Sequence, residues 1–373
     1  MREFINGADA ISRAALDAGC DFFAGYPITP ATPILLNMVR ELPLVGGIAI
    51  QAEDEIAAIG MCIGAAIGGK RVLTATSGPG ISLYSENIGL AIMGEVPMVI
   101  VNCQRMGPAT GAATTTSQGD IQFMRWGTSG GLPLIVLAPV DAADAYACTR
   151  QAFELAERFR VPVIIATDKE TVSAAVTLDG HVLTAEPLAP RRILPTDQPF
   201  RSYNPDKPAE VVPLADMDSH IVRFNTSSHD PEGYLTKKPE RLAALNRHLE
   251  EKILAHADAI TRYHFDRDDG ARTLFISYGI SAASTQQAVL DARKKGHSVS
   301  CLTLTTLWPV PESILKEALS GMERVIVVEM NNRQYRREID RLAHPEQEVR
   351  SIISLSGELI SPVRILAEGG VFA

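Results

Sequence analysis

The chain has 373 residues, 46% hydrophobic and 21% charged, with 35 Lys and Arg against 44 Asp and Glu and a net charge of −9. This length predicts two or three domains, and the acidic balance argues against nucleic-acid binding, which needs a concentrated basic face. The five cysteines are sparse and form no C-x-x-C pair, so we expect reduced thiols in the cytoplasm and neither a metal site nor an iron–sulfur cluster on this chain.

Short β-rich runs alternate with helical stretches from residue 8 to residue 168. This alternation predicts a parallel sheet with helices on both faces. The apolar stretch 56–69 falls short of the ~20 residues that span a bilayer, so we expect a helix buried on most sides and no membrane span. We expect strands at 21–25, 46–51, 71–76, 96–103, 132–139 and 161–168, and helices at 7–19, 30–42, 54–66, 82–94 and 141–159.

The composition changes beyond this region. Residues 176–265 are rich in proline and polar loops, and they end in a stretch, 239–263, that predicts one long amphipathic helix. The β/α alternation then resumes, with strands expected at 273–279, 298–304 and 323–330 and helices at 281–296 and 311–322. We therefore predict an α/β domain at 1–175, a connector at 176–265 and a second α/β domain at 266–373.

The stretch "YPITP", residues 26–30, is a stiff corner between a predicted strand and a helix, because each proline fixes φ. Ligands bind at the carboxyl ends of strands in open α/β sheets, so Thr29 would be presented there with little freedom. A proline-stiffened loop without a ligand is the simpler interpretation of these residues alone.

Acidic residues open the apolar helix in "QAEDEIAAIG", residues 51–60. Acids at a helix start complement the macrodipole, which explains most such runs. The helix behind them is almost wholly apolar, however, so Glu55 is expected to be partly buried and to need a partner.

A third loop, residues 105–127, begins with Arg105 at the end of a predicted strand and is rich in Gly, Thr and Gln. Loops of this length are often functional, and arginine binds a planar carboxylate through two hydrogen bonds. A solvated surface charge is the alternative. The turn "SGPG", residues 77–80, is a weak phosphate signal, and tight helix–strand packing is its simpler explanation.

Together "GYPITPATP", "QAEDEIAAIG", "TATSGPGISL", "QRMGPATG", "SQGDIQFMRWG" and "VVEMNNRQY" resemble the alpha subunit of the 2-oxoacid:ferredoxin oxidoreductases, in particular the 2-oxoglutarate and branched-chain types. The resemblance covers nearly the whole chain. It implies a thiamine diphosphate pyrimidine-binding domain followed by a transketolase C-terminal-like α/β domain. It also implies oxidative decarboxylation of a 2-oxoacid with coenzyme A and reduction of ferredoxin.

The resemblance assigns residues as well. It implies that Glu55, with Glu53 as second choice, activates the aminopyrimidine of thiamine, and that Thr29 and Arg105 contact the substrate carboxylate. The loop residues Tyr26, Pro27 and Ile28 would line the cofactor pocket.

A beta subunit would complete the enzyme. This chain has no G-D-G followed by an Asn pair and no cluster cysteines, so the Mg²⁺ and 4Fe-4S sites are expected on the beta subunit. The resemblance leaves open whether gamma and delta subunits exist.

The substrate is less sharply indicated. Arg125 in "FMRWG" is the available cation for the distal carboxylate of 2-oxoglutarate, whereas "TSGGLP" departs from the His-Gly-Asp of many relatives. A branched-chain 2-oxoacid is the first alternative. A non-redox thiamine half-chain and a non-catalytic binding protein are the others.

Overall fold

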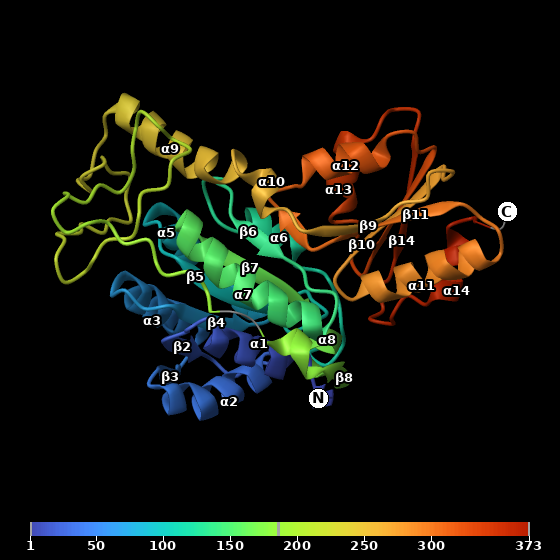
Figure 1. Ribbon diagram of the computed structural model, residues 1–373, viewed down its shortest axis with the longest axis horizontal. Coiled ribbons are helices and arrows are strands. Elements are labelled where there is room, and N and C mark those ends of the chain that lie inside the picture. Colours follow the sequence, from blue (N-terminus) through green and yellow to red (C-terminus); the bar gives the residue numbers. More distant parts are fainter. Residues whose placement is uncertain (1, 185–186, 372–373) are drawn as a thin grey trace.

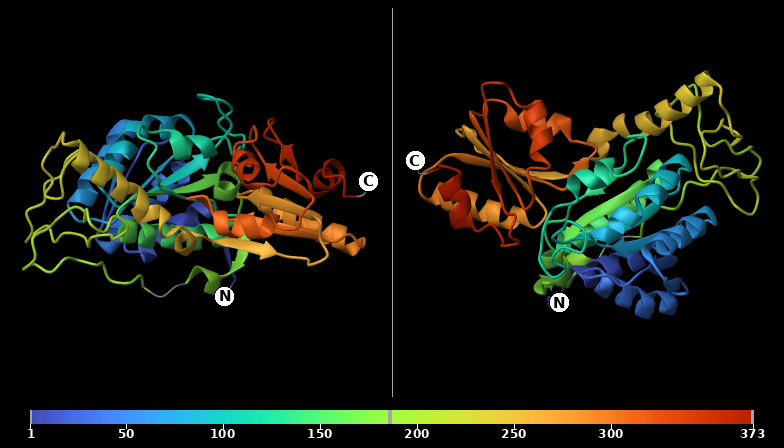
Figure 2. Two further views of the ribbon diagram at one scale, coloured as in Figure 1. Left: turned by 90° about the horizontal axis from the view of Figure 1, so that it is seen from above. Right: turned by 180° about the vertical axis from the view of Figure 1, so that it is seen from behind.

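The computed structural model describes residues 2–184 and 187–371. A large α/β unit forms the centre of the molecule, and a smaller α/β unit lies at one end of it (Figure 1). The loops before α9 and the start of α9 lie at the opposite end in all three ribbon views (Figures 1 and 2). The predicted boundaries of 1–175, 176–265 and 266–373 stay a prediction.

Seven of the described strands form the central sheet, in the order β12-β6-β7-β5-β4-β2-β3. Six pair in parallel, as predicted, and β12 runs antiparallel to β6. Their Val- and Ile-rich runs are typical of strands covered on both faces. The strands are β2 (Phe22–Gly25), β3 (Ile48–Gln51), β4 (Val72–Thr76), β5 (Met98–Gln104), β6 (Ile135–Leu137), β7 (Pro162–Asp168) and β12 (Thr306–Trp308).

Helices cover both faces of this sheet. On one face α1 packs against α2 and α7, and on the other α3 packs against α5, as right-handed crossovers require. Asn6, Asp54 and Asp141 cap α1, α3 and α7 by accepting backbone N–H bonds. The helices are α1 (Gly7–Asp17), α2 (Thr32–Glu41), α3 (Glu55–Ile67), α4 (Pro79–Leu83), α5 (Ser85–Met93), α6 (Ile121–Trp126), α7 (Ala142–Phe159) and α8 (Lys169–Ser173).

The connector contains little regular structure before its helix. The predicted single helix over 239–263 is wrong: α9 ends at Leu254, and a short α10 follows. The helical stretch does not run to residue 263 because the main chain of Arg262 bonds Thr305 and Thr306, and residues 263–266 pair as a strand with the C-terminal sheet. The elements of the connector are β8 (Val176–Asp179), η2 (Gly180–Leu183), α9 (Pro239–Leu254) and α10 (Ala257–Ile260). Two further elements, β1 (Arg2–Ile5) and η1 (Leu42–Val45), belong to the amino-terminal region.

The smaller unit is a sheet of order β14-β13-β10-β11-β9. Its parallel centre was predicted, whereas the edge strands β9 and β14 were not. The elements are β9 (Tyr263–Asp266), β10 (Thr273–Tyr278), β11 (Val299–Leu304), β13 (Arg324–Glu329), β14 (Glu348–Ile353), α11 (Ser281–Lys294), α12 (Glu312–Leu319), α13 (Arg336–Leu342) and α14 (Pro362–Glu368).

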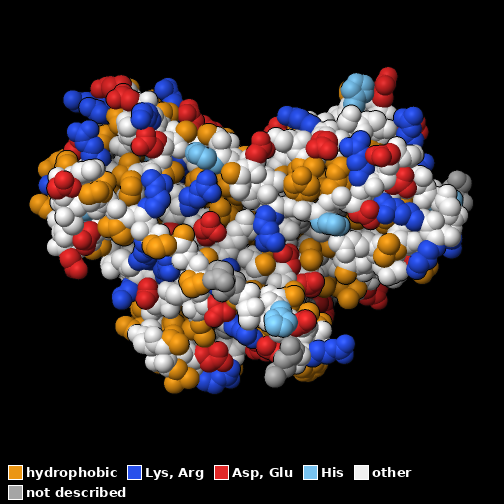
Figure 3. Space-filling model, viewed as in Figure 1, with side chains coloured by type: hydrophobic (Ala, Val, Ile, Leu, Met, Phe, Trp, Pro, Cys, Tyr) orange, Lys and Arg blue, Asp and Glu red, His pale blue; other side chains and the backbone are white. Residues whose placement is uncertain are grey.

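Acidic and basic side chains are interspersed on the face shown in Figure 3. That face of the described residues therefore carries no concentrated basic patch of the kind that binds nucleic acid. No helix within the described ranges is both long and apolar enough to cross a membrane.

Candidate functional site

The strand order reverses beside β2. From β2 the chain passes to β3 on one side, and then returns to β4 on the other side before continuing to β5. The loops that follow β2, β3 and β4 thus diverge at the carboxyl ends of their strands, where open α/β sheets form their binding crevice. Three of the stretches singled out in the sequence, 26–30, 52–55 and 77–80, are these loops.

Arg105 and Thr29 meet at these carboxyl ends of the strands. The Nη1 group of Arg105 donates to the main-chain carbonyl of Thr29 over 2.6 Å. The Arg105 side chain is buried, with 5% exposure, and its Nε has no hydrogen-bond partner within the described residues. Thr29 itself is exposed. The structure therefore brings together the two residues that the sequence assigned to the substrate carboxylate.

Glu55 lies in the first turn of α3 and is buried, as predicted. The side chain lies against Gly80, where an added Cβ would be 3.1 Å from Glu55 Oε1 and 2.0 Å from Thr76 Oγ1. No hydrogen bond or ion pair to the Glu55 carboxylate is found among the described residues, so the expected partner is not supplied by this part of the chain. Glu53, the second choice, is exposed.

The turn of residues 77–80 separates Glu55 from Arg105. On its other side a Cβ at Gly78, whose φ is 37°, would lie 3.3 Å from Arg105 Nε. Thr76 Oγ1 and Ser77 Oγ at the same turn are buried without hydrogen-bond partners in the described chain. Buried polar atoms are nearly always paired, so these groups suit a polar ligand in the crevice.

Asn102 and Asp120 were not recognised from the sequence. The Asn102 side-chain amide donates to Asp120 Oδ2 over 3.0 Å. Burial raises the pKa of Asp120 to about 6, although the Asn102 bond and the charge of Arg105 oppose that shift. Asn102 lies near the end of β5, and Asp120 lies in the loop of residues 105–127 that begins with Arg105. This closeness to Arg105 in the sequence could have indicated that both residues belong to the site.

The structure does not bring Arg125 to this pair. Its guanidinium donates to the carbonyls of Leu132 and Gly131 and stacks on the Trp126 ring at 3.9 Å. The pocket that Arg125 lines, at α6, α12 and α13, includes neither Thr29 nor Arg105. Its role in binding the distal carboxylate stays a prediction.

The three residues that the resemblance assigned to the cofactor pocket differ in how exposed their side chains are. Tyr26 and Ile28 are half-buried, whereas Pro27 is exposed. Their assignment to the cofactor pocket stays a prediction, as does that of Glu53 and Glu55.

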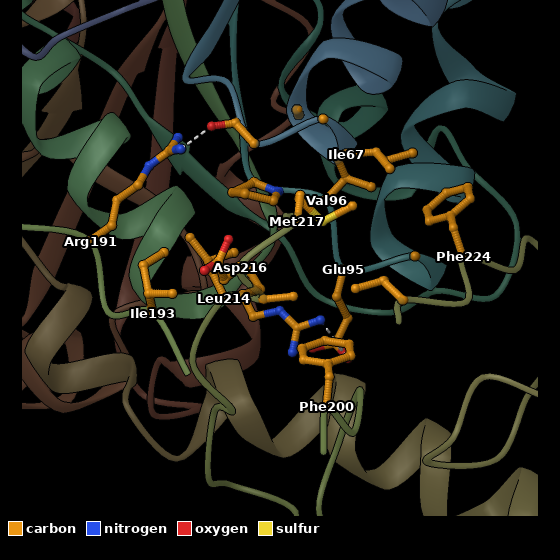
Figure 4. A pocket seen from close by; sticks show the side chains of 18 of the residues that line it. Ile67, Glu95, Val96, Arg191, Ile193, Phe200, Leu214, Asp216, Met217 and Phe224 are labelled. Atoms are coloured by element: carbon orange, nitrogen blue, oxygen red, sulfur yellow. Dashed lines mark hydrogen bonds and ion pairs between the residues drawn. The ribbon is translucent and has the colours of Figure 1, made fainter. Parts of the chain in front are cut away.

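A cavity of about 410 Å³ lies at the opposite edge of the sheet, beside residues that immediately precede β4, β5 and β7. Figure 4 shows Phe200, Met217 and Phe224 around it, with Glu95 at its base. Burial alone would raise the pKa of Glu95, but Arg160, Lys252 and His248 together hold it well below its usual range. This cavity contains none of the predicted site residues.

Residues 13–230 match a family described as "Pyruvate flavodoxin/ferredoxin oxidoreductase, thiamine diP-bdg", and residues 271–365 match "Pyruvate:ferredoxin oxidoreductase core domain II". The chain is 39% identical over 363 residues to the 2-oxoglutarate synthase subunit KorA of Methanocaldococcus jannaschii, which covers 96% of this chain and 97% of that one. The chain belongs to the 2-oxoacid:ferredoxin oxidoreductase family.

Two further proteins that resemble this chain carry different substrates in their names. The ketoisovalerate oxidoreductase subunit VorB of Methanothermobacter thermautotrophicus is 35% identical, covering 96% of this chain and 94% of its own length. The solved "2-oxoglutarate:ferredoxin oxidoreductase from Magnetococcus marinus with 2-oxoglutarate, coenzyme A and succinyl-CoA bound" has a TM-score of 0.90 at 27% identity. It covers 98% of this chain, which spans 64% of that chain's length. These matches confirm the predicted family and fold class.

Proposed function

We infer that this chain is the alpha subunit of a 2-oxoglutarate:ferredoxin oxidoreductase. The reaction converts 2-oxoglutarate, coenzyme A and two oxidised ferredoxins into succinyl-CoA, CO2, a proton and two reduced ferredoxins. The observation that carries this inference is the match over nearly the full chain to subunits named 2-oxoglutarate synthase. The Arg105–Thr29 pair at the switch point of the sheet is consistent with it.

Arg105 and Thr29 are proposed to bind the carboxylate next to the reacting ketone. Arg105 is nearly buried, so its charge acts in a medium where an ion pair is stronger than in water. Its bond to the Thr29 carbonyl fixes the arginine against the stiff corner of residues 26–30. A substrate held in this way loses rotational freedom before the reaction, which lowers the barrier.

Glu55 is the residue proposed to activate thiamine diphosphate, which supplies the nucleophilic and electron-accepting centre for decarboxylation when bound. A carboxylate beside a ring nitrogen can share a proton with it. The buried position and the lack of a partner within the described chain suit Glu55 for this contact better than exposed Glu53. Tyr26, Pro27 and Ile28 are proposed to line the same pocket.

A beta subunit is proposed to supply the rest of the active site, including Mg²⁺ and a 4Fe-4S cluster. All five cysteines of this chain are free and buried, and no group of three metal-ligating side chains is found among the described residues.

The prediction that α3 is buried on most sides is wrong for this chain alone, since Ile56 and Met61 are 52% and 40% exposed. A Cβ at Gly60 or Gly64 would meet nothing within 4 Å. We propose that this face of α3 contacts the beta subunit.

Ferredoxin as electron acceptor, coenzyme A as co-substrate and a cytoplasmic location complete the proposal. Gamma and delta subunits belong to it only as optional partners. For the distal carboxylate the proposal names Arg125, whose contact with substrate would compete with its bonds to Gly131 and Leu132.

Co-expression with beta-type subunits tests the proposal. The purified complex is assayed for thiamine- and CoA-dependent reduction of a low-potential dye with 2-oxoglutarate, 2-oxoisovalerate and pyruvate. We expect activity that depends on CoA and is highest with 2-oxoglutarate. A preference for 2-oxoisovalerate would favour the branched-chain alternative suggested by the VorB relatives. Turnover without dye reduction would favour the non-redox alternative. A stable complex that turns over none of the three acids would count against the inference.

A further inference from the structure

The loop of residues 117–122 leads from the Arg105 loop into α6, and it lies against the C-terminal α/β unit. Its central residue, Gln118, is 1% exposed. The Gln118 main-chain N–H and side-chain Nε2 donate to the carbonyls of Met330 and Tyr278, each over 2.9 Å. Its Oε1 accepts from the Met330 N–H and from the Ser281 hydroxyl, each over 2.9 Å. A buried glutamine is thus bonded at both ends to one neighbouring unit, which is typical of a position that needs one defined geometry.

Asn331 and Gln334 hold the same loop through its carbonyl groups. The Asn331 Nδ2 donates to the Gln118 carbonyl over 2.8 Å and to the Tyr278 hydroxyl over 2.8 Å. The Gln334 Nε2 donates to the Gly119 carbonyl over 2.5 Å. Gln122 adds two bonds in return, one to Oε1 and one to the main-chain oxygen of Gln334. We call the set Gln118, Asn331 and Gln334 the interdomain clamp.

The two adjacent asparagines have different environments. Asn331 is 3% exposed and lies in the clamp, and its Oδ1 also accepts the Gln334 N–H over 2.8 Å. Asn332 is exposed and has a contact only with Arg333 among those the structure records in the described chain. Of the two asparagines, only Asn331 therefore contacts the loop of residues 117–122.

The clamped loop reaches the substrate side of the crevice. Two residues after Gln118, the Asp120 N–H donates to Gln104 Oε1 over 3.1 Å, and Asp120 Oδ2 accepts from Asn102 over 3.0 Å. Gln104 directly precedes Arg105, and the Asp120 carboxyl group interacts electrostatically with the Arg105 charge. Hydrogen bonds thus hold the loop at Gln118 on the side of the C-terminal unit and at Asp120 on the side of Gln104, the residue before Arg105.

We propose that the C-terminal α/β unit positions the substrate site through the interdomain clamp. Gln118, Asn331 and Gln334 are positioning residues, since they act on Arg105 only through the loop that holds Asp120. The effect on catalysis rests on the proposed function of Arg105. The effect on the loop does not, so the two can be measured separately.

The test compares Asn331→Asp with Asn332→Asp in the co-expressed complex. Asn331→Asp keeps the acceptor for the Gln334 N–H but replaces the donor with an oxygen that repels the Gln118 carbonyl. We expect amide hydrogen exchange in peptides covering residues 115–122 to rise about tenfold or more, and the KM for 2-oxoglutarate to rise about tenfold with a smaller change in kcat. Asn332→Asp makes the same change of charge one residue away and should alter neither quantity.

Three outcomes are decisive. Unchanged exchange in Asn331→Asp would show that the clamp does not hold the loop. Faster exchange with a wild-type KM would overturn the positioning role while leaving the clamp in place. If the wild-type complex turned over no 2-oxoacid, the proposed function would fail, and the exchange measurement would still decide whether the clamp holds the loop. Should Asn331→Asp not fold, Gln334→Glu removes the donor to Gly119, keeps the acceptor for Gln122, and is expected to give the same two changes.

Discussion

Arg105 donates a hydrogen bond to the main-chain carbonyl of Thr29 across 76 positions of the sequence. The bond joins the end of β5 to the loop that follows β2, with the carboxyl end of β4 between them. It fixes a buried guanidinium at the place where open α/β sheets bind their ligands.

Glu55→Gln should reduce kcat by about 100-fold or more, because general acid–base groups contribute roughly 10² to 10⁴ in rate. Glutamine has the same shape but cannot share a proton as a carboxylate does. Steady-state assays of the purified complex measure the change, and size-exclusion chromatography checks that assembly is intact. Glu53→Gln is the matched control, since Glu53 is exposed two residues away. A larger loss of kcat in Glu53→Gln than in Glu55→Gln would transfer the role to Glu53.

Arg105→Lys should raise the KM for the 2-oxoacid about tenfold or more while the chain still folds. Lysine keeps the charge but not the planar fork that binds a carboxylate with two bonds. Initial-rate measurements with 2-oxoglutarate at fixed coenzyme A give the value. An unchanged KM would place the substrate carboxylate elsewhere.

Arg125→Ala tests whether Arg125 binds the distal carboxylate of 2-oxoglutarate. If Arg125 binds the second carboxylate, the KM for 2-oxoglutarate should rise at least about tenfold, whereas that for 2-oxoisovalerate should stay the same. Assays with each of the two acids separate this effect from a structural disturbance caused by losing the bonds to Gly131 and Leu132, which would affect both acids. Equal changes for both acids would argue against a distal-carboxylate role.

Gly60→Arg should prevent assembly with the beta subunit without unfolding the chain. A Cβ at Gly60 would meet nothing within 4 Å in this chain, and glycine is the poorer helix former of the two. Co-purification measures assembly, and thermal unfolding of the separate chain measures stability. Ala283→Arg, at an exposed position of α11, is the control and should co-purify normally. Normal assembly of Gly60→Arg would place the interface on another face.

Asp168 should make the stability of the chain depend on pH. Burial raises its pKa from 3.8 to about 6, although bonds from Thr171 oppose the shift. A raised pKa means that the folded chain holds the proton more tightly, so this contribution is full below about pH 4 and is lost as the pH rises through 6.

Asp168→Asn should remove that contribution. The free energy of unfolding of the wild type, minus that of Asp168→Asn, should therefore fall by about 1.4 kcal/mol between pH 5 and pH 7. Urea unfolding at each pH measures the difference. Asp141→Asn, which makes the same substitution at an exposed N-cap, is measured alongside it for comparison. A difference that rises with pH would contradict the sign of the argument.

Local patterns predicted much of the central unit. Alternating apolar strands and capped helices indicated the order from residue 7 to residue 168, and those elements are present within a few residues. The predicted helix does not extend to residue 263 because Arg262 bonds Thr305 and Thr306, two partners more than 40 positions away that no local pattern reveals. Strand β12 was missed for a similar reason, since three residues from the C-terminal region complete the edge of the central sheet.

The sequence by itself determined the family, the stiff corner at Thr29, the acid that opens α3 and the arginine at the end of β5, because each is a short motif with a local physical meaning. The tertiary structure decided which of these residues meet. Parallel pairing brought Thr29 and Arg105 to one edge of the sheet, placed Glu55 behind the turn of residues 77–80, and left Arg125 in a different pocket. It also decided that Asn331 rather than Asn332 contacts Gln118. Such contacts depend on strand order and on the packing of two sheets, which no local stretch of sequence specifies.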